Sequence, residues 1–162
     1  MFLLLFKKYS DKLFNLSFIG FAIAIWLLSY AVILPFIPFN DGIENPIREH
    51  HIIIYFIAAC LIAPILETAM HQSFPIYIFT KVLIKNKHLA IFISALTFGL
   101  IHFYSLYYIL LTFVVGLLYA WAYLNYYERR GFAHAFWGIA VAHALRNVVA
   151  VTVNFFFPEL VI

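Results

Sequence analysis

Apolar residues form long runs along this chain, and short polar connections separate the runs. A helix needs about 20 apolar residues to cross a bilayer, and the chain has room for about five such spans. The run from Leu89 to Leu124 is too long for one helix, so we divide it at the aromatic stretch Phe103–Tyr108. The expected spans are 13–35, 52–80, 89 to about 103, about 108 to 124, and 135–157. The pattern predicts an all-α, polytopic membrane helix bundle.

Prolines mark the ends and the weak points of these runs. The first run ends in the sequence PFIPFNDG, where two prolines, an asparagine and a glycine stop a helix. The second run contains Pro64 and Pro75 and is long enough to tilt, or to break at either residue. We expect one integral-membrane domain over residues 1–162, with a cytoplasmic tail at 1–12 and a core that carries the functional site at 52–157.

Composition also indicates a membrane protein. The chain is 66% hydrophobic and 10% charged, whereas roughly a quarter of the residues in a soluble domain are charged. The net charge is only +3, and the basic residues stand beside apolar runs. Such clusters face anionic lipid, so we expect the lipid bilayer as a partner and no nucleic acid.

The positions of the basic clusters predict the orientation of the chain. One cluster precedes the first expected span, one follows the second and one follows the fourth; their residues are Lys7, Lys8, Lys12, Lys81, Lys85, Lys87, Arg129 and Arg130. All three lie on the same side if the N-terminus is cytoplasmic, as the positive-inside rule requires. We therefore expect a multi-pass protein of the cell's inner (plasma) membrane, with its C-terminus outside.

Glu67 is the one acidic residue deep within the apolar runs. A carboxylate at the bilayer centre costs about 2.5–3.5 kcal/mol on insertion scales, so its presence indicates a function. At about 1.5 Å per helical residue, the nearest basic clusters place Glu67, His102 and His143 each roughly 20 Å from the cytoplasmic edge. Three spans are therefore expected to bring these side chains to one level.

Two further polar residues accompany His143 on the last span. Asn147 follows it by four residues, so both side chains share a helix face and can donate to one oxygen atom. Arg146 can snorkel, pair with Glu67, or hold an anionic group of a substrate. The structural alternatives are a carboxylate neutralised by Arg146 and histidines that donate to neighbouring carbonyls. His71, on the Glu67 face, is expected to be a packing residue or a supporting partner.

The segments ETAMHQ, FGLIH and HALRN carry the polar residues in order along the chain. They resemble the motifs EExxxR, FxxxH and HxxxN of the CPBP family (CAAX protease and bacteriocin-processing, also called Abi) of intramembrane glutamate peptidases. Each motif is weak alone, but three in this order inside apolar runs are specific. The resemblance covers about residues 63–147.

Two positions depart from the family pattern. Thr68 stands where the second glutamate is usual, and Gln72 stands where the arginine is usual. Together the departures remove one charge of each sign, which is far less damaging than the loss of one partner of a buried ion pair. We expect Thr68 and Gln72 to form a neutral, hydrogen-bonded supporting pair.

The resemblance implies an enzyme that hydrolyses a peptide bond in a membrane-anchored protein or peptide, as in CAAX proteolysis or bacterial peptide processing. Glu67 would be the general base on a water molecule that His102 helps to hold, and His143 and Asn147 would donate to the oxyanion. We favour a reaction without a cofactor, because asparagine is a poor zinc ligand. Zinc held by Glu67, His102 and His143 is the alternative.

Three other functions remain open at this point. Two histidines at one depth on separate spans could ligate haem in a small membrane cytochrome. A catalytically silent bacteriocin-immunity or scaffold protein could share the fold and the motifs. A proton-coupled transporter would need a longer relay than one carboxylate provides.

Overall fold

The computed structural model describes residues 12–14, 16–33 and 52–156. Within these ranges every regular element is helical, which confirms the predicted all-α membrane helix bundle. The elements are α2 (Phe18–Ile33), a helical stretch over Ile52–Val82, α6 (Lys87–Leu100), α7 (Leu106–Arg130) and α8 (Phe132–Phe156). The expected cytoplasmic tail and the expected end of the first span at residue 35 lie almost wholly outside the described residues.

The division of the long apolar run is close to the predicted position, but the resulting helices differ in length. Ile52–Val82, α7 and α8 are each long and apolar enough to cross a membrane, whereas α2 and α6 are shorter. The 14 residues of α6 rise about 21 Å, less than the hydrocarbon core of about 30 Å. The described helices thus provide three full-length candidate spans and two shorter apolar helices.

The stretch from Ile52 to Val82 does not break at either proline. It alternates between α-helical and π-helical turns: α3 (Ile52–Ile57), η3 (Ala58–Ile62), α4 (Ala63–Glu67), η4 (Thr68–Ser73), α5 (Phe74–Tyr77) and η5 (Ile78–Val82). Pro64 and Pro75 each occupy the first turn of a short α-helical segment that follows a π-helical one. The missing N–H of proline is tolerated there, and the π-helical turns absorb the local misfit.

The first proline leaves a carbonyl that a neighbouring helix satisfies. The N–H of Ala63 donates five residues back to Ala58, so the next donor in that register is Pro64, which has no N–H. The carbonyl of Ala59 instead accepts a hydrogen bond of 2.8 Å from Nδ2 of Asn147 on α8. An apolar environment requires such partners, because no water is at hand for an exposed backbone group.

A side chain of α6 also bonds to the backbone near the second proline. The N–H of Phe74 donates five residues back to Ala69, so Pro75 removes the donor to the next carbonyl in that register, which belongs to Met70. The hydroxyl of Ser94 on α6 donates to the adjacent carbonyl of His71. Side chains from two other helices therefore bond to the π-helical backbone close to the two prolines.

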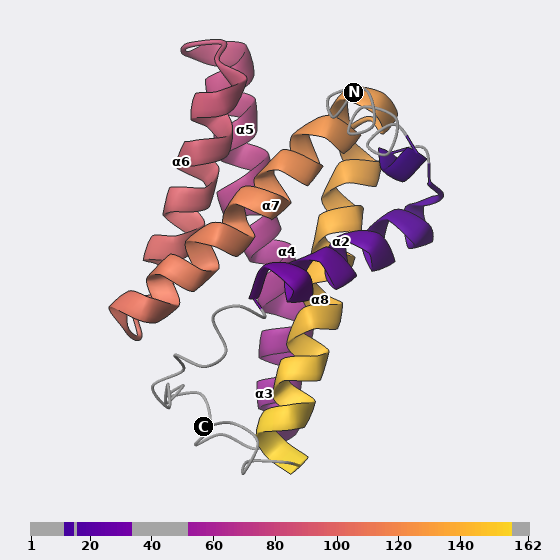
Figure 1. Cartoon of the computed structure of the whole chain (residues 1–162), viewed down its shortest axis with the longest axis vertical. Helices are drawn as coiled ribbons and strands as arrows, with labels where there is room; N and C mark the ends of the chain where they lie inside the picture. The colour runs from indigo at the N-terminus through magenta and orange to yellow at the C-terminus, as the bar shows by residue number, and fades with distance from the viewer. Residues whose placement is uncertain (1–11, 15, 34–51, 157–162) are drawn as a thin grey trace.

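Small residues and aromatic rings bring the helices into contact. A Cβ atom on Gly99 of α6 would lie 2.9 Å from Cβ of Phe113, and one on Gly116 of α7 would lie 3.0 Å from Cα of Ala95, so α6 and α7 approach backbone to backbone. At the other side of α7, the ring of Phe21 on α2 stacks on Tyr126 with centroids 3.7 Å apart. Together these contacts fix α2, α6 and α8 around α7 (Figure 1).

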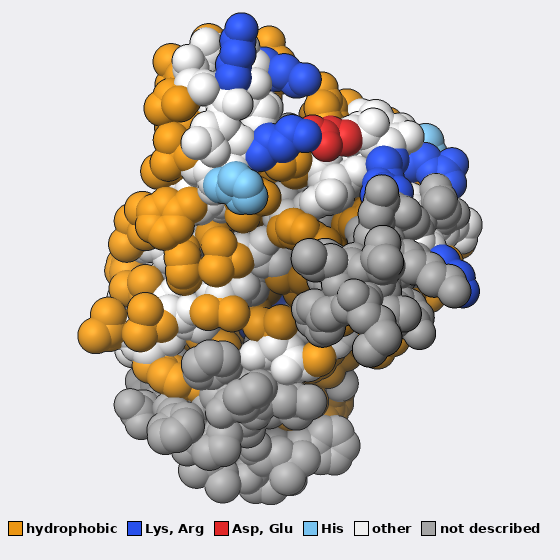
Figure 2. All heavy atoms as spheres, turned by 45° about the horizontal axis from the view of Figure 1, so that its top comes forward, with side chains coloured by type: hydrophobic (Ala, Val, Ile, Leu, Met, Phe, Trp, Pro, Cys, Tyr) orange, Lys and Arg blue, Asp and Glu red, His pale blue; other side chains and the backbone are white. Residues whose placement is uncertain are grey.

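The connections of the bundle lie at different levels. Figure 1 shows the η5–α6 and α7–α8 connections at the upper end, the α6–α7 connection farther down on the left, and α3 and the end of α8 at the lower end. Lys and Arg side chains gather at the upper end of the view in Figure 2, and hydrophobic side chains cover much of the described surface below them. Many large apolar side chains of Ile52–Val82 are exposed, as lipid-facing residues are.

Candidate active site

Glu67 is the last residue of α4, at the junction with the π-helical η4. Its side chain is mostly buried, with 20% of its surface exposed. Oε2 has no hydrogen-bond partner within the described residues, although it lies 3.8 Å from Nε2 of His102 and 3.7 Å from Nε2 of His143. Both separations are too long for a direct hydrogen bond. The carboxylate therefore faces two imidazole nitrogens across short gaps.

The end of α6 presents His102 to this carboxylate. The residue lies just beyond Leu100, and its backbone N–H donates to the carbonyl of Gly99. Nδ1 lies 2.7 Å from the carbonyl oxygen of Phe98. Because a carbonyl oxygen only accepts, Nδ1 must carry the proton of this bond. In the neutral ring, Nε2 therefore has a lone pair, and it is this atom that faces Glu67.

His143 enters the site from the middle of α8. Its side chain is only 2% exposed, and Nδ1 has no hydrogen-bond partner among the described residues. The ring lies between two aromatic side chains, with centroids 5.6 Å from Phe98 and 5.5 Å from Tyr119. These walls keep the imidazole in place without fixing which of its nitrogens carries the proton.

Phe98 and Tyr119 are the site residues that the motif reasoning missed. Phe98 is the first letter of the segment FGLIH, and its ring contacts both His102, with centroids 4.9 Å apart, and His143. The FGLIH motif therefore already pointed to Phe98 as a residue of the site. Tyr119 is fully buried, but nothing distinguishes it by sequence from the chain's other tyrosines.

Asn147 makes a structural hydrogen bond besides the donation to the oxyanion that the motif suggests. Its Nδ2 atom donates to the carbonyl of Ala59 and so attaches α8 to η3. A side-chain amide has two N–H donors, so one of them is engaged with the backbone and the other is free to take part in chemistry. The bond also orients the amide, because the π-helical carbonyl fixes one of its hydrogens.

Arg146 precedes Asn147 and follows His143 by almost one turn of α8. Its positive charge acts on Glu67, on His102 and on His143. The predicted alternative of an ion pair with Glu67 is not found among the described residues, where the carboxylate faces the two histidines. Nε of Arg146 is buried and lacks a hydrogen-bond partner in the same part of the chain.

The expected hydrogen bond between Thr68 and Gln72 is wrong. Both side chains are completely buried, yet neither the hydroxyl of Thr68 nor the amide of Gln72 has a hydrogen-bond partner in the described ranges. Both residues belong to the π-helical turn η4, whose hydrogen-bond spacing and side-chain angles differ from those of an α-helix. His71 is buried beside them and packs against Phe98 with centroids 6.4 Å apart, as expected for a packing residue.

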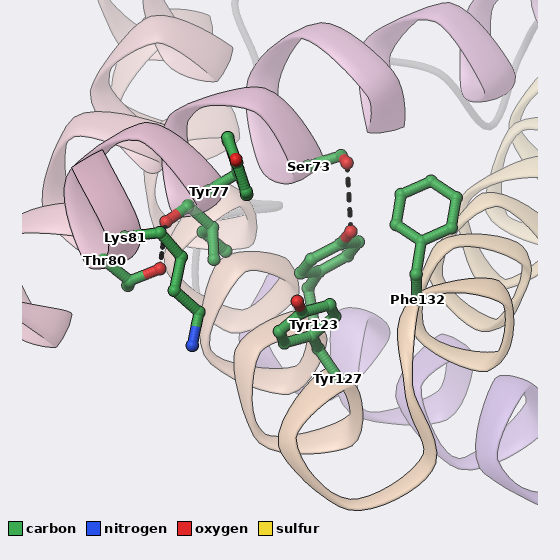
Figure 3. A pocket seen from close by; sticks show the side chains of 8 residues that line it. Ser73, Tyr77, Thr80, Lys81, Tyr123, Tyr127 and Phe132 are labelled. Atoms are coloured by element: carbon green, nitrogen blue, oxygen red, sulfur yellow. Dashed lines mark hydrogen bonds between the residues drawn. The ribbon is translucent and has the colours of Figure 1, made fainter.

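A pocket of about 130 Å³ lies away from this cluster, nearer the end of the molecule that carries Lys81 (Figure 3). Ser73 and Tyr123 face each other across it and share a hydrogen bond of 3.0 Å. The remaining lining residues are Ile76, Tyr77, Thr80, Lys81, Tyr127 and Phe132. None of the motif residues lines it, so it is not the place where their chemistry occurs.

The cluster can also be considered as a metal centre. No group of three His, Cys, Asp and Glu side chains within residues 12–14, 16–33 and 52–156 is arranged to hold a metal ion. Zinc held by Glu67, His102 and His143 stays an untested alternative to the metal-free site. What the cluster can do by itself is accept, hold and donate protons around one small polar group.

Comparison with known proteins supplies a family. Residues 49–149 match the model of a protein family described as type II CAAX prenyl endopeptidase Rce1-like. The match covers well over half of the chain and includes Glu67, His102, His143 and Asn147, and it confirms the family resemblance that the three motifs indicate. No curated protein and no solved structure matches the chain.

Proposed function

Because the chain belongs to the type II CAAX prenyl endopeptidase Rce1-like family of membrane peptidases, we propose that it hydrolyses a peptide bond near the C-terminus of a prenylated, membrane-anchored protein or peptide. Glu67 is the general base of this proposal. The observation that carries it is the convergence of one carboxylate oxygen with two imidazole nitrogens from α6 and α8. The family gives the class of reaction, and the residues below give its steps.

The hydrogen-bonding state of His102 supports a water molecule between it and Glu67. Its Nδ1–H is engaged with Phe98, so two acceptors, Nε2 of the neutral ring and Oε2 of Glu67, face each other at 3.8 Å. A water molecule has two O–H donors and satisfies both acceptors at once. In that position its lone pairs point away from both side chains and are available to attack a carbonyl carbon.

The reaction then needs one base and one set of donors. Glu67 takes a proton from the water as its oxygen bonds to the scissile carbonyl carbon. His143 and the free N–H of Asn147 donate to the oxyanion that forms on the carbonyl oxygen. The proton on Glu67 passes to the peptide nitrogen, the C–N bond breaks, and a new carboxylic acid and a free amine leave. No step requires a metal ion.

A reconstituted assay tests the proposal. The purified protein in lipid vesicles is expected to cleave a prenylated peptide of the CAAX type, and Glu67→Gln is expected to lower turnover to background while the protein stays folded, because the amide keeps the shape and removes the base. Glu128→Gln is the matched control, since it removes a carboxylate that pairs with Lys87 on the surface. Full turnover by Glu67→Gln would falsify the glutamate mechanism, and activity in neither protein would favour the catalytically silent alternative.

A further inference from the structure

Arg146 is a cation in the middle of a membrane helix. It follows the start of α8 by more than three turns and precedes the end by nearly three. The other lysines and arginines in the described part of the chain lie near helix ends: Lys12, Lys81, Lys85, Lys87, Arg129 and Arg130. A guanidinium at such depth is costly and faces the protein interior or a polar cavity, so it marks a function.

No carboxylate neutralises this cation within the described residues. Glu67, the acid on the neighbouring membrane helix, lies against His102 and His143 and forms no ion pair with Arg146 among the described residues, and Nε of Arg146 is buried there without an acceptor. The backbone carbonyl of Arg146 accepts a hydrogen bond from Tyr30, which fixes the helix and leaves the side chain unaffected. One buried donor of the guanidinium, the N–H of Nε, therefore has no acceptor within the described part of the chain.

The position of Arg146 along α8 relates it to the direction of a bound substrate. Three residues correspond to about 4.5 Å along a helix, so Arg146 is that much farther than His143 from the basic end of the bundle. A substrate chain that enters from the basic end with its C-terminus leading has its scissile bond at His143. Its last residues then extend towards Arg146, and three extended residues span about 10 Å.

We propose that Arg146 binds the C-terminal carboxylate of the substrate and so determines where the chain is cut. The inference rests on the proposed function and names the substrate group that the site recognises. Arginine suits this task because its planar fork donates two parallel hydrogen bonds to a carboxylate. In this chain Gln72 is neutral where the family motif has an arginine, so the cation beside the site comes from α8.

Two peptide substrates that differ only in their C-terminal group test the proposal. The probes are a prenylated CAAX-type peptide with a free C-terminal carboxylate and the same peptide with a C-terminal amide. We expect the native protein to cleave the acid with a kcat/KM about 10- to 100-fold above that of the amide, as the loss of a charged hydrogen bond predicts. Arg146→Gln is expected to lower kcat/KM for the acid to the level of the amide and to leave the amide almost unchanged.

The control variants separate this role from simpler ones. Arg130→Gln removes the same charge at the end of α7 and is expected to preserve the preference for the acid. If Arg146→Gln weakens cleavage of both peptides equally, Arg146 acts only as a counter-charge to Glu67 and the proposal is overturned. Equal cleavage of both peptides by the native protein also overturns it, whether or not the variant folds.

The same experiment distinguishes the inference from the function on which it rests. Cleavage of either peptide by the native protein, abolished in Glu67→Gln, supports the proposed function whatever the acid-to-amide ratio is. Cleavage of neither peptide contradicts the proposed function. A third peptide, with the amide end and a glutamate as the last residue, identifies the source of the carboxylate, because its cleavage at the rate of the acid would place a side chain, and not the chain terminus, at Arg146.

Discussion

At the scale of single residues, two polar side chains of the site, Asn147 and His102, each make a structural contact besides the one proposed for the reaction. Asn147 bonds to a backbone carbonyl and offers a second donor to the site. His102 is fixed by Phe98 through one nitrogen and faces Glu67 with the other. An apolar environment explains this economy, because each extra buried polar group adds a desolvation cost that only a partner offsets.

A substitution of His143 tests whether the two histidines act through their protons or bind a metal ion. As an oxyanion donor, it can be replaced in part by a side-chain amide, so His143→Gln is expected to lower kcat by about 10²–10³ and not to abolish it. The native protein is then expected to contain no stoichiometric zinc. Steady-state kinetics together with elemental analysis of the purified protein measure both quantities.

His88→Gln, an exposed residue at the start of α6, is the control for the substitution itself. The opposite outcome would be seen in the zinc content and the activity together. One zinc per chain, lost in His143→Gln together with all activity, would assign Glu67, His102 and His143 to a metal and reverse the choice between the two chemistries.

At the scale of helices, the Ile52–Val82 stretch shows how two prolines persist in a membrane span. Each is preceded by a π-helical turn. Asn147 donates to the carbonyl that Pro64 leaves, and Ser94 donates to a carbonyl of the π-helical turn before Pro75. Glu67 lies between the two prolines, at a junction of α-helical and π-helical turns. The irregular backbone therefore both attaches the neighbouring helices and positions the carboxylate.

A double-mutant cycle tests the link between Pro64 and Asn147. Asn147→Ala leaves the carbonyl of Ala59 without a donor and is expected to lower stability by about 0.6–1.7 kcal/mol, the range for such bonds in membranes. Pro64→Ala restores a backbone N–H, so the cost of Asn147→Ala in that background is expected to fall towards zero. Thermal unfolding in detergent measures the four proteins of the cycle.

Ser94→Ala provides the matched control, because its carbonyl partner, His71, is remote from the position that Pro64 affects. Its cost is expected to be the same in the native chain and in the Pro64→Ala variant. Equal costs of Asn147→Ala in the two backgrounds would show that Asn147 stabilises α8 by some means other than the carbonyl that Pro64 frees.

The sequence predicted the positions of the helices better than their ends and contacts. Depth counting from the basic clusters brought Glu67, His102 and His143 to one level because almost every residue between each of them and its basic cluster is helical. The partner of Asn147 was not predictable, since it depends on the π-helical register of another helix. The expected span from 89 to about 103 lies close to α6, but α7 extends to Arg130, six residues past the expected end at Leu124, because hydropathy does not mark the polar last turns of a helix.

At the scale of the whole molecule, the two ends of the bundle differ in charge. Lys81, Lys85, Lys87, Arg129 and Arg130 belong to the η5–α6 and α7–α8 connections, and both connections lie at the upper end in Figure 1. This arrangement supports the orientation that we propose, with the basic end in the cytoplasm. It also gives the substrate its direction, because a prenylated cytoplasmic protein approaches from that end.

Cysteine labelling tests this orientation. The sole native cysteine, Cys60, is replaced by serine, and single cysteines are introduced at exposed positions of opposite ends, Ile84→Cys and Phe156→Cys. In intact cells, a membrane-impermeant maleimide is expected to label position 156 and not position 84, and disrupted membranes are expected to react at both.

A third position, Phe103→Cys, tests the short α6 within the same experiment. Phe103 is the most exposed of the large apolar residues, so in water a cysteine there would react quickly. Because α6 rises only about 21 Å, its end is expected to lie within the hydrocarbon region, and position 103 should react slowly from both sides of the membrane. Rapid labelling of position 103 from outside would mean that α6 and its connection reach the surface, and His102 would then be too shallow to share a buried site with Glu67. Labelling of position 84 in intact cells would reverse the orientation and, with it, the direction of substrate entry on which the role of Arg146 depends.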